Sequence, residues 1–269
     1  MKIALLTAAL FITGLPPLFA QSKTNKKMET IVLVHGAWSD ASAWDQVVPI
    51  LKAKGYEVIA VNLPGHGKDN TSFANITLAA YVETVKKAIG TSNNVILVGH
   101  SMAGLVISEV AEQIPDQITR LVYLAAFLPK NGESLLSLAQ SDADSHIGKY
   151  LQVDKDHGSA ALAKDGIIDV FAADAPQPVQ EYLLANFKPD PLAPLATPVV
   201  LSDANFGRIE KVYIHTLNDH AVSYPLQQRM VNGANVAREY AIPSSHTPFL
   251  SMPALLAAIL LEEAKPTTR

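Results

Sequence analysis

The chain carries a serine in a setting that suits nucleophilic catalysis. Ser101 lies in the segment Gly99-His100-Ser101-Met102-Ala103-Gly104, after the apolar run 94–98 and before the helically spaced stretch 105–113. Such a strand–turn–helix junction is typical of a nucleophile elbow, whose strained turn exposes the hydroxyl in front of a helix N-terminus. The usual pattern G-x-S-x-G has glycine where this chain has Ala103, and one additional methyl group is compatible with close strand–helix packing.

A serine hydroxyl needs a base to remove its proton and an acid to orient that base. Asp219 follows the apolar run 211–216, and His246 lies in the turn-rich loop after the run 238–242. The other seven histidines lie beside or before the serine, inside a strand run, beside the acid or in a segment without strand patterns. Ser101, Asp219 and His246 therefore follow the chain order of α/β hydrolases, with Asp203 as the alternative acid.

Acyl transfer also needs two donors that stabilise the developing oxyanion. The backbone N–H of Met102 follows the serine directly, and the backbone N–H of Ala37 follows the apolar run 30–34. These two amides form the predicted oxyanion hole. Trp38 is adjacent to this hole and is a candidate wall of the substrate pocket.

Runs typical of buried strands alternate with helically spaced segments over most of the chain. The strand runs are 30–34, 56–62, 94–98, 120–127, 211–216 and 238–242, and the helical segments are 43–54, 77–90, 105–113, 224–232 and 252–262. This alternation predicts a mostly parallel, doubly wound α/β sheet with functional loops at the carboxyl ends of its strands. We expect one α/β-hydrolase domain over residues 30–269.

The alternation stops between about residues 130 and 190, where short helical pieces at 135–140, 160–173 and 179–187 predict a helical cap inserted over the active site. This segment holds five lysines and ten acidic residues, so its net charge is −5, compared with −4 for the whole chain. A solvated outer face accounts for most of these carboxylates, but an acidic cap would also slow the approach of anionic esters at low salt. The predicted pocket residues are Gly36, Trp38, His100, Phe127, Leu135, Phe171, Phe187 and Thr247.

The composition is that of a globular protein with one large core: 269 residues, 49% hydrophobic, without cysteine. Residues 1–20 combine Lys2, an apolar run and a terminal Ala20, which predicts a signal peptide, and residues 21–29 form a polar leader expected to be flexible. We therefore expect export to the periplasm or the medium. The apolar run is too short and interrupted for a stable membrane anchor.

No clustered basic face, metal-ligand spacing or phosphate-binding loop is present in the sequence. Nucleic acid is therefore not an expected partner, and we predict neither a metal nor a cofactor. The expected partner is a small-molecule ester. Whether the protein is a monomer or a homodimer stays open.

Residues 31–67, the elbow, residues 120–129, residues 211–222 and the His246 loop resemble the α/β-hydrolase family of plant methylesterases, hydroxynitrile lyases and their bacterial relatives. This resemblance implies a serine esterase that cleaves small to medium carboxylic esters through an acyl-enzyme. A hydroxynitrile lyase is one alternative, and a slow-turnover ligand-binding protein on the same fold is another.

Three positions separate the esterases from the lyases within this resemblance. The lyases tend to carry threonine, glutamate and lysine where this chain has Gly36, His100 and Thr247. Without the lysine, a departing cyanide has no evident cation beside it. These positions favour hydrolysis.

Overall fold

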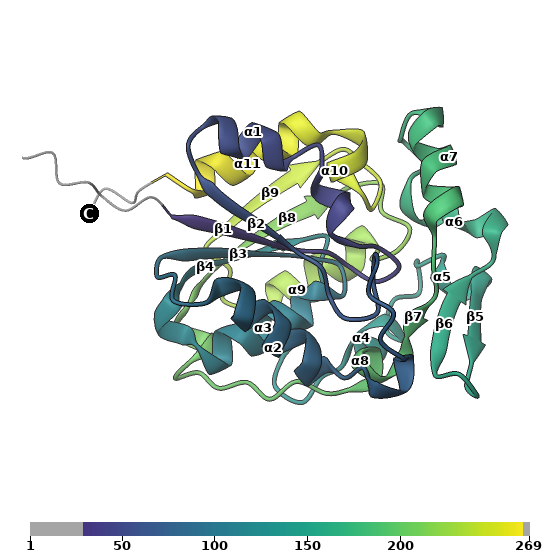
Figure 1. Cartoon of the computed structure of the whole chain (residues 1–269), viewed down its shortest axis with the longest axis horizontal. Coiled ribbons are helices and arrows are strands. Elements are labelled where there is room, and N and C mark those ends of the chain that lie inside the picture. The colour runs from purple at the N-terminus through teal and green to yellow at the C-terminus, as the bar shows by residue number, and fades with distance from the viewer. Residues whose placement is uncertain (1–28, 266–269) are drawn as a thin grey trace, which may run out of the picture.

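The computed structural model describes residues 29–265, so the predicted signal peptide 1–20 and nearly all of the leader 21–29 lie outside the described residues. Within this range, six parallel strands form one sheet in the order β2-β1-β3-β4-β8-β9 (Figure 1). The strands are β1 (Thr30–Val34), β2 (Glu57–Val61), β3 (Val95–His100), β4 (Ile118–Leu124), β8 (Glu210–Thr216) and β9 (Arg238–Ile242). The predicted α/β-hydrolase architecture is confirmed.

Helices cover both faces of the sheet (Figure 1). One face carries α1 (Val48–Ala53), α10 (Pro248–Ser251) and α11 (Pro253–Glu263), and the other carries α2 (Leu78–Ile89), α3 (Ala103–Gln113) and α9 (Tyr224–Asn232). Short 3₁₀ helices lie at Ala41–Trp44, Phe73–Asn75, Pro115–Gln117, Lys164–Gly166 and Phe206–Arg208. The predicted helix 43–54 is thus two pieces, and α1 begins beside Pro49, a residue that favours the first turn of a helix.

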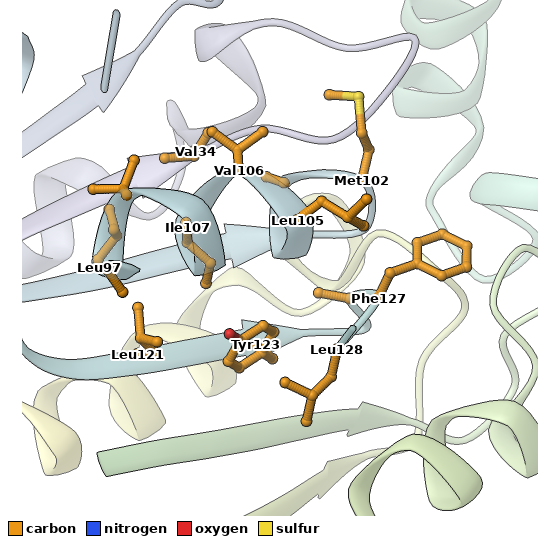
Figure 2. Packing of buried hydrophobic residues seen from close by; sticks show 14 of the residues in the cluster. Val34, Leu97, Met102, Leu105, Val106, Ile107, Leu121, Tyr123, Phe127 and Leu128 are labelled. Atoms are coloured by element: carbon orange, nitrogen blue, oxygen red, sulfur yellow. The ribbon is translucent and has the colours of Figure 1, made fainter. Parts of the chain in front are cut away.

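The core forms two layers because side chains alternate across the sheet. Val32 and Val34 of β1 pack on the α2–α3 side, whereas Ile31 and Leu33 pack on the α1–α11 side. Figure 2 shows the first layer, with Leu97, Leu121 and Tyr123 of the strands packed against apolar residues of α3. Burial on both faces explains why these strands are continuous apolar runs in the sequence.

The cap lies beside the carboxyl ends of the strands (Figure 1). Its helices are α4 (Leu135–Ala139), α5 (Ile147–Tyr150), α6 (Ile167–Phe171) and α7 (Gln177–Asn186), and α8 (Leu192–Ala196) follows. It also contains an antiparallel sheet of β5 (Leu151–Asp154), β6 (Ser159–Leu162) and β7 (Asp190–Pro191). This sheet was not expected from the sequence, in which residues 130–190 carry only short helical patterns.

The predicted helix 160–173 is wrong in its first part, where β6 occupies residues 159–162. Burial in β6 alternates from residue to residue, with Ala160 and Leu162 buried, and Gly158 adopts a positive φ of 63° in the preceding turn. Four residues with period two are too few to outweigh the helical pattern of the residues that follow. Among residues 29–265, no helix is long and apolar enough to span a membrane.

Candidate active site

Ser101 occupies the sharp turn between β3 and α3. Its φ of 54° lies in the left-handed region, which is strained for a residue with a side chain. The turn is held by Ser101 N–H, which donates to Leu124 O (3.2 Å), and by Phe127 N–H, which donates to Ser101 O (3.1 Å). The geometry is that of a nucleophile elbow.

The glycines around the elbow explain why Ala103 is tolerated. A Cβ atom on Gly99 would lie 2.8 Å from Ala103 O, and one on Gly104 would overlap the carbonyl oxygen of Phe127. The tightest approach therefore falls at Gly104, one residue after the usual second glycine of the pattern. Ala103 itself is fully buried without such an overlap.

Asp219 and His246 are joined at the carboxyl edge of the sheet. His246 Nδ1 lies 2.8 Å from Asp219 Oδ2, and both side chains are buried. The other carboxylate oxygen accepts hydrogen bonds from the backbone N–H groups of Ala221 (2.8 Å) and Val222 (2.9 Å), while Thr216 Oγ1 donates to Oδ2 (2.6 Å). These donors stabilise an ionised carboxylate and fix its orientation toward His246.

The alternative acid, Asp203, lies elsewhere. It is exposed, precedes the amino end of β8, and borders a surface depression together with Lys130 and Lys211. Asp219 follows the carboxyl end of the same strand. Because β8 separates the two aspartates, the structure brings His246 to Asp219.

His100 connects the elbow to the His246 loop. The two imidazole rings lie 4.5 Å apart between centroids, and His100 Nε2–H donates to the backbone oxygen of His246 (2.9 Å). Burial, together with the neighbouring His246, lowers the pKa of His100 well below its usual range. A neutral His100 therefore precedes the nucleophile in the chain and contacts the loop that carries the candidate base.

The predicted oxyanion loop packs against the elbow. A Cβ atom on Gly36 would lie 2.8 Å from both Ser101 Cβ and His100 Nδ1, so this position has room only for glycine. Among residues 29–265, neither the Ala37 N–H nor the Met102 N–H donates a hydrogen bond to another protein group. Both amides are therefore available to a ligand.

A cleft of about 670 Å³, including the space open to solvent, lies beneath the cap. Of the predicted pocket residues, Trp38, His100, Phe171, Phe187 and Thr247 line it. Gly36 does not line it, and lies behind the lining residue His100. Tyr182, Asn186 and Phe249 also line the cleft and were not predicted from the sequence. Helical spacing along α7 relates Tyr182 to Asn186, but the sequence carries no signal for which face of α7 points to the sheet.

Phe127 and Leu135 do not line this cleft. Both are buried in the core layer that contains α3, and Figure 2 places Phe127 beside that helix. Their assignment to the pocket assumed that apolar residues at the start of the cap face the substrate. They instead pack the cap onto the sheet domain.

The elbow, the parallel sheet and the Asp219–His246 pair together define an α/β hydrolase. Residues 31–259 match the model of the alpha/beta hydrolase family, and the chain belongs to this family.

The relatives include enzymes from plants and bacteria. "Putative methylesterase 11, chloroplastic" from Arabidopsis thaliana is 31% identical over 247 residues, which cover 87% of this chain and 63% of that protein. A solved pyrethroid hydrolase from Sphingobium faniae is 26% identical with a TM-score of 0.79 and covers 88% of this chain and 97% of its own. An extracellular α/β-hydrolase from a Paenibacillus species is 26% identical with a TM-score of 0.76, and the match covers 87% of this chain and 98% of that protein. The chain spans 55–63% of the length of the first three plant relatives.

Proposed function

We propose that this protein is a serine hydrolase that cleaves small to medium carboxylic esters. The observation that carries the proposal is the buried Asp219–His246 hydrogen bond beside the strained Ser101 elbow. The names of the relatives, a methylesterase and a pyrethroid hydrolase, support ester cleavage.

In the proposed reaction, Ser101 Oγ attacks the ester carbonyl while His246 accepts the hydroxyl proton. The Asp219 carboxylate keeps the His246 Nδ1–H in place, so that Nε2 is the basic nitrogen. The N–H groups of Ala37 and Met102 bind the oxyanion of the tetrahedral intermediate. His246 then returns the proton to the leaving alcohol as the C–O bond breaks, and water releases the acid from the acyl-enzyme by the same route.

The cleft favours esters with an apolar or aromatic group. Trp38 lies with Phe171 and Phe187 in one aromatic cluster, with ring centroids 5.6 to 6.3 Å apart. Among the described residues that line the cleft, none is lysine or arginine. This composition supports hydrolysis of a neutral ester over cyanohydrin cleavage, in which the departing cyanide needs a positive charge nearby.

The test measures hydrolysis of neutral p-nitrophenyl esters by the wild type, Ser101→Ala, Asp219→Asn and Asp203→Asn. We expect Ser101→Ala and Asp219→Asn each to lower kcat by roughly 10⁴-fold, because the members of a triad act as a unit. Asp203→Asn is the matched control: it alters an aspartate in the loop before β8, whereas Asp219 lies in the loop after β8, and its activity should equal that of the wild type. Circular dichroism checks that each variant folds.

Three results would contradict the proposal. Ser101→Ala that keeps more than about a tenth of the activity would exclude the nucleophile. Cyanide release from mandelonitrile that exceeds ester cleavage would indicate a lyase. A single burst of product without turnover would indicate a ligand-binding protein.

We also propose that the protein is exported to the periplasm or the medium after cleavage behind Ala20. The pattern of residues 1–20 supports this proposal, as does the extracellular location in the name of the Paenibacillus relative. Mass spectrometry of the protein from the native host should find a mature N-terminus at Gln21. A mature chain that retains Met1 inside the cell would contradict it.

A further inference from the structure

Two histidines and one aspartate from three separate segments meet outside the proposed active site. His146 precedes α5 and Asp169 lies within α6, both in the cap, whereas His220 follows Asp219 in the loop after β8. His146 Nδ1 lies 2.8 Å from one oxygen of the Asp169 carboxylate, and His220 Nδ1 lies 3.0 Å from the other. One atom from each of the three side chains lies within 4.8 Å of the other two.

The two imidazole rings face each other, with centroids 4.2 Å apart and planes inclined by 33°. Both Nδ1 atoms lie within hydrogen-bond distance of the Asp169 carboxylate, and His220 Nδ1 lies equally close, at 3.0 Å, to the backbone oxygen of Asp169. Two imidazole nitrogens and one carboxylate oxygen form a ligand set that suits zinc and related transition metals, whereas magnesium and calcium prefer oxygen ligands alone.

The backbone around these side chains is fixed by hydrogen bonds that do not use the ligand atoms. His146 N–H donates to His220 O (2.8 Å), and Ser145 Oγ donates to Ala221 O (2.8 Å). Ser223 N–H donates to Asp142 (2.8 Å), which joins the same two segments again. Because the ligands are already positioned, an ion would pay little entropy to assemble them.

The site is also accessible. The side chains of His146, Asp169 and His220 are 28%, 33% and 38% exposed, so an ion can enter from solvent and keep a water ligand. None of the three lines the cleft. Within residues 29–265, no other group of three or more histidine, cysteine and acidic side chains has such an arrangement.

We propose that His146, Asp169 and His220 bind a divalent transition-metal ion, with zinc as the best match to the ligand set. The ion would join the cap, through His146 and Asp169, to the loop that carries Asp219, through His220. Its role in this position is to hold the cap, and the proposal is independent of ester hydrolysis.

The experiment titrates zinc into the full chain, prepared without a polyhistidine tag and stripped with chelator, and follows the heat of binding. We expect one zinc ion per chain in the wild type. Residues that only hydrogen-bond to metal ligands already contribute about 10- to 100-fold to metal affinity, so loss of a direct ligand in His146→Gln or Asp169→Asn should weaken binding at least tenfold. Magnesium should produce no binding heat.

His157→Gln is the matched control, because His157 contacts Asp154 at 2.7 Å in an exposed pair that lacks a third ligand. It should bind zinc like the wild type, and zinc should raise the thermal midpoint of both proteins but not of the two ligand variants. Asp169→Asn changes one atom, so it keeps the test valid if His146→Gln fails to fold. Equal zinc affinity in all four proteins, or no binding to the wild type, would overturn the proposal.

Discussion

His35 is a buried histidine whose hydrogen bonds select its neutral form. Its Nε2 accepts from Leu63 N–H (3.1 Å), so the ring proton lies on Nδ1, which donates to Gly36 O (2.8 Å). Burial and the neighbouring His66 lower the pKa of His35 from 6.5 to about 3. A second proton would break the bond to Leu63, which links the end of β1 to the turn after β2.

This residue should make folding sensitive to acid. Between pH 6.5 and 3 the unfolded chain binds a proton on His35 that the folded chain does not, so the free energy of unfolding decreases as the pH falls. For this pKa change, the free energy of unfolding is about 2 kcal/mol smaller at pH 5 than at high pH. The free energy of unfolding can be measured with urea at pH 7 and at pH 5. Its decrease between these two pH values should be about 2 kcal/mol smaller in His35→Gln than in the wild type. The same dependence in both proteins would exclude His35 as its source.

At the scale of elements, Asp190 joins the cap to the predicted oxyanion loop. Its carboxylate is fully buried at β7, accepts from Trp38 N–H, and lies 2.9 Å from His66 Nε2 in the turn after β2. Trp38 adopts a positive φ of 56° and donates from Nε1 to Ala160 O of β6 (2.9 Å). The residue after Ala37 is thus held by two cap strands.

Removing the Asp190 charge should loosen this junction. Although burial opposes ionisation of His66, its hydrogen bond and attraction to Asp190 raise the pKa of His66 overall, so His66 keeps its proton to a higher pH than a free histidine. Breaking one partner of a buried pair costs about 3 to 5 kcal/mol, so Asp190→Asn should lower the free energy of unfolding by about 3 kcal/mol and reduce kcat. Asp154→Asn, in the exposed pair with His157, is the control and should change neither. Equal stability of both variants would contradict a stabilising role of Asp190 between the cap and the predicted oxyanion loop.

At the scale of the whole molecule, the charge of the cap is unevenly distributed. Six of its ten acidic residues are exposed: Asp144, Asp154, Asp156, Asp165, Asp174 and Glu181. Asp142 and Asp190 are instead buried and bind backbone N–H groups. Most of the negative charge predicted for the cap therefore faces solvent, where it repels anions and is screened by salt.

This charge predicts a salt effect that depends on the substrate. An ester that carries a carboxylate should gain kcat/KM as salt rises, because the Debye length decreases from about 30 Å at 0.01 M to about 10 Å at 0.1 M. Its neutral analogue should not respond. Glu181→Gln, beside the cleft residue Tyr182, should reduce the difference between the two esters. Identical salt responses would leave the carboxylates without a role in substrate selection.

Local patterns in the sequence predict most elements of the sheet domain and the chain order of the candidate triad. Strands buried on both faces are continuous apolar runs, and Ser101 lies at the one junction whose pattern is typical of an elbow. Both signals are local, because they depend on neighbours within a few residues. The predictions were less accurate where the pattern was short, as in β6.

Which distant residues meet depends on tertiary packing. Asp203 and Asp219 are both loop aspartates in the sequence, and the length of β8 places only the latter beside His246. Asp190 reaches Trp38 across 152 positions, and His146, Asp169 and His220 come from three segments without metal-ligand spacing. Contacts of this kind depend on how the cap packs against the edge of the sheet. Such packing depends on the surfaces of two elements together, so a pattern within one segment of the sequence does not predict it.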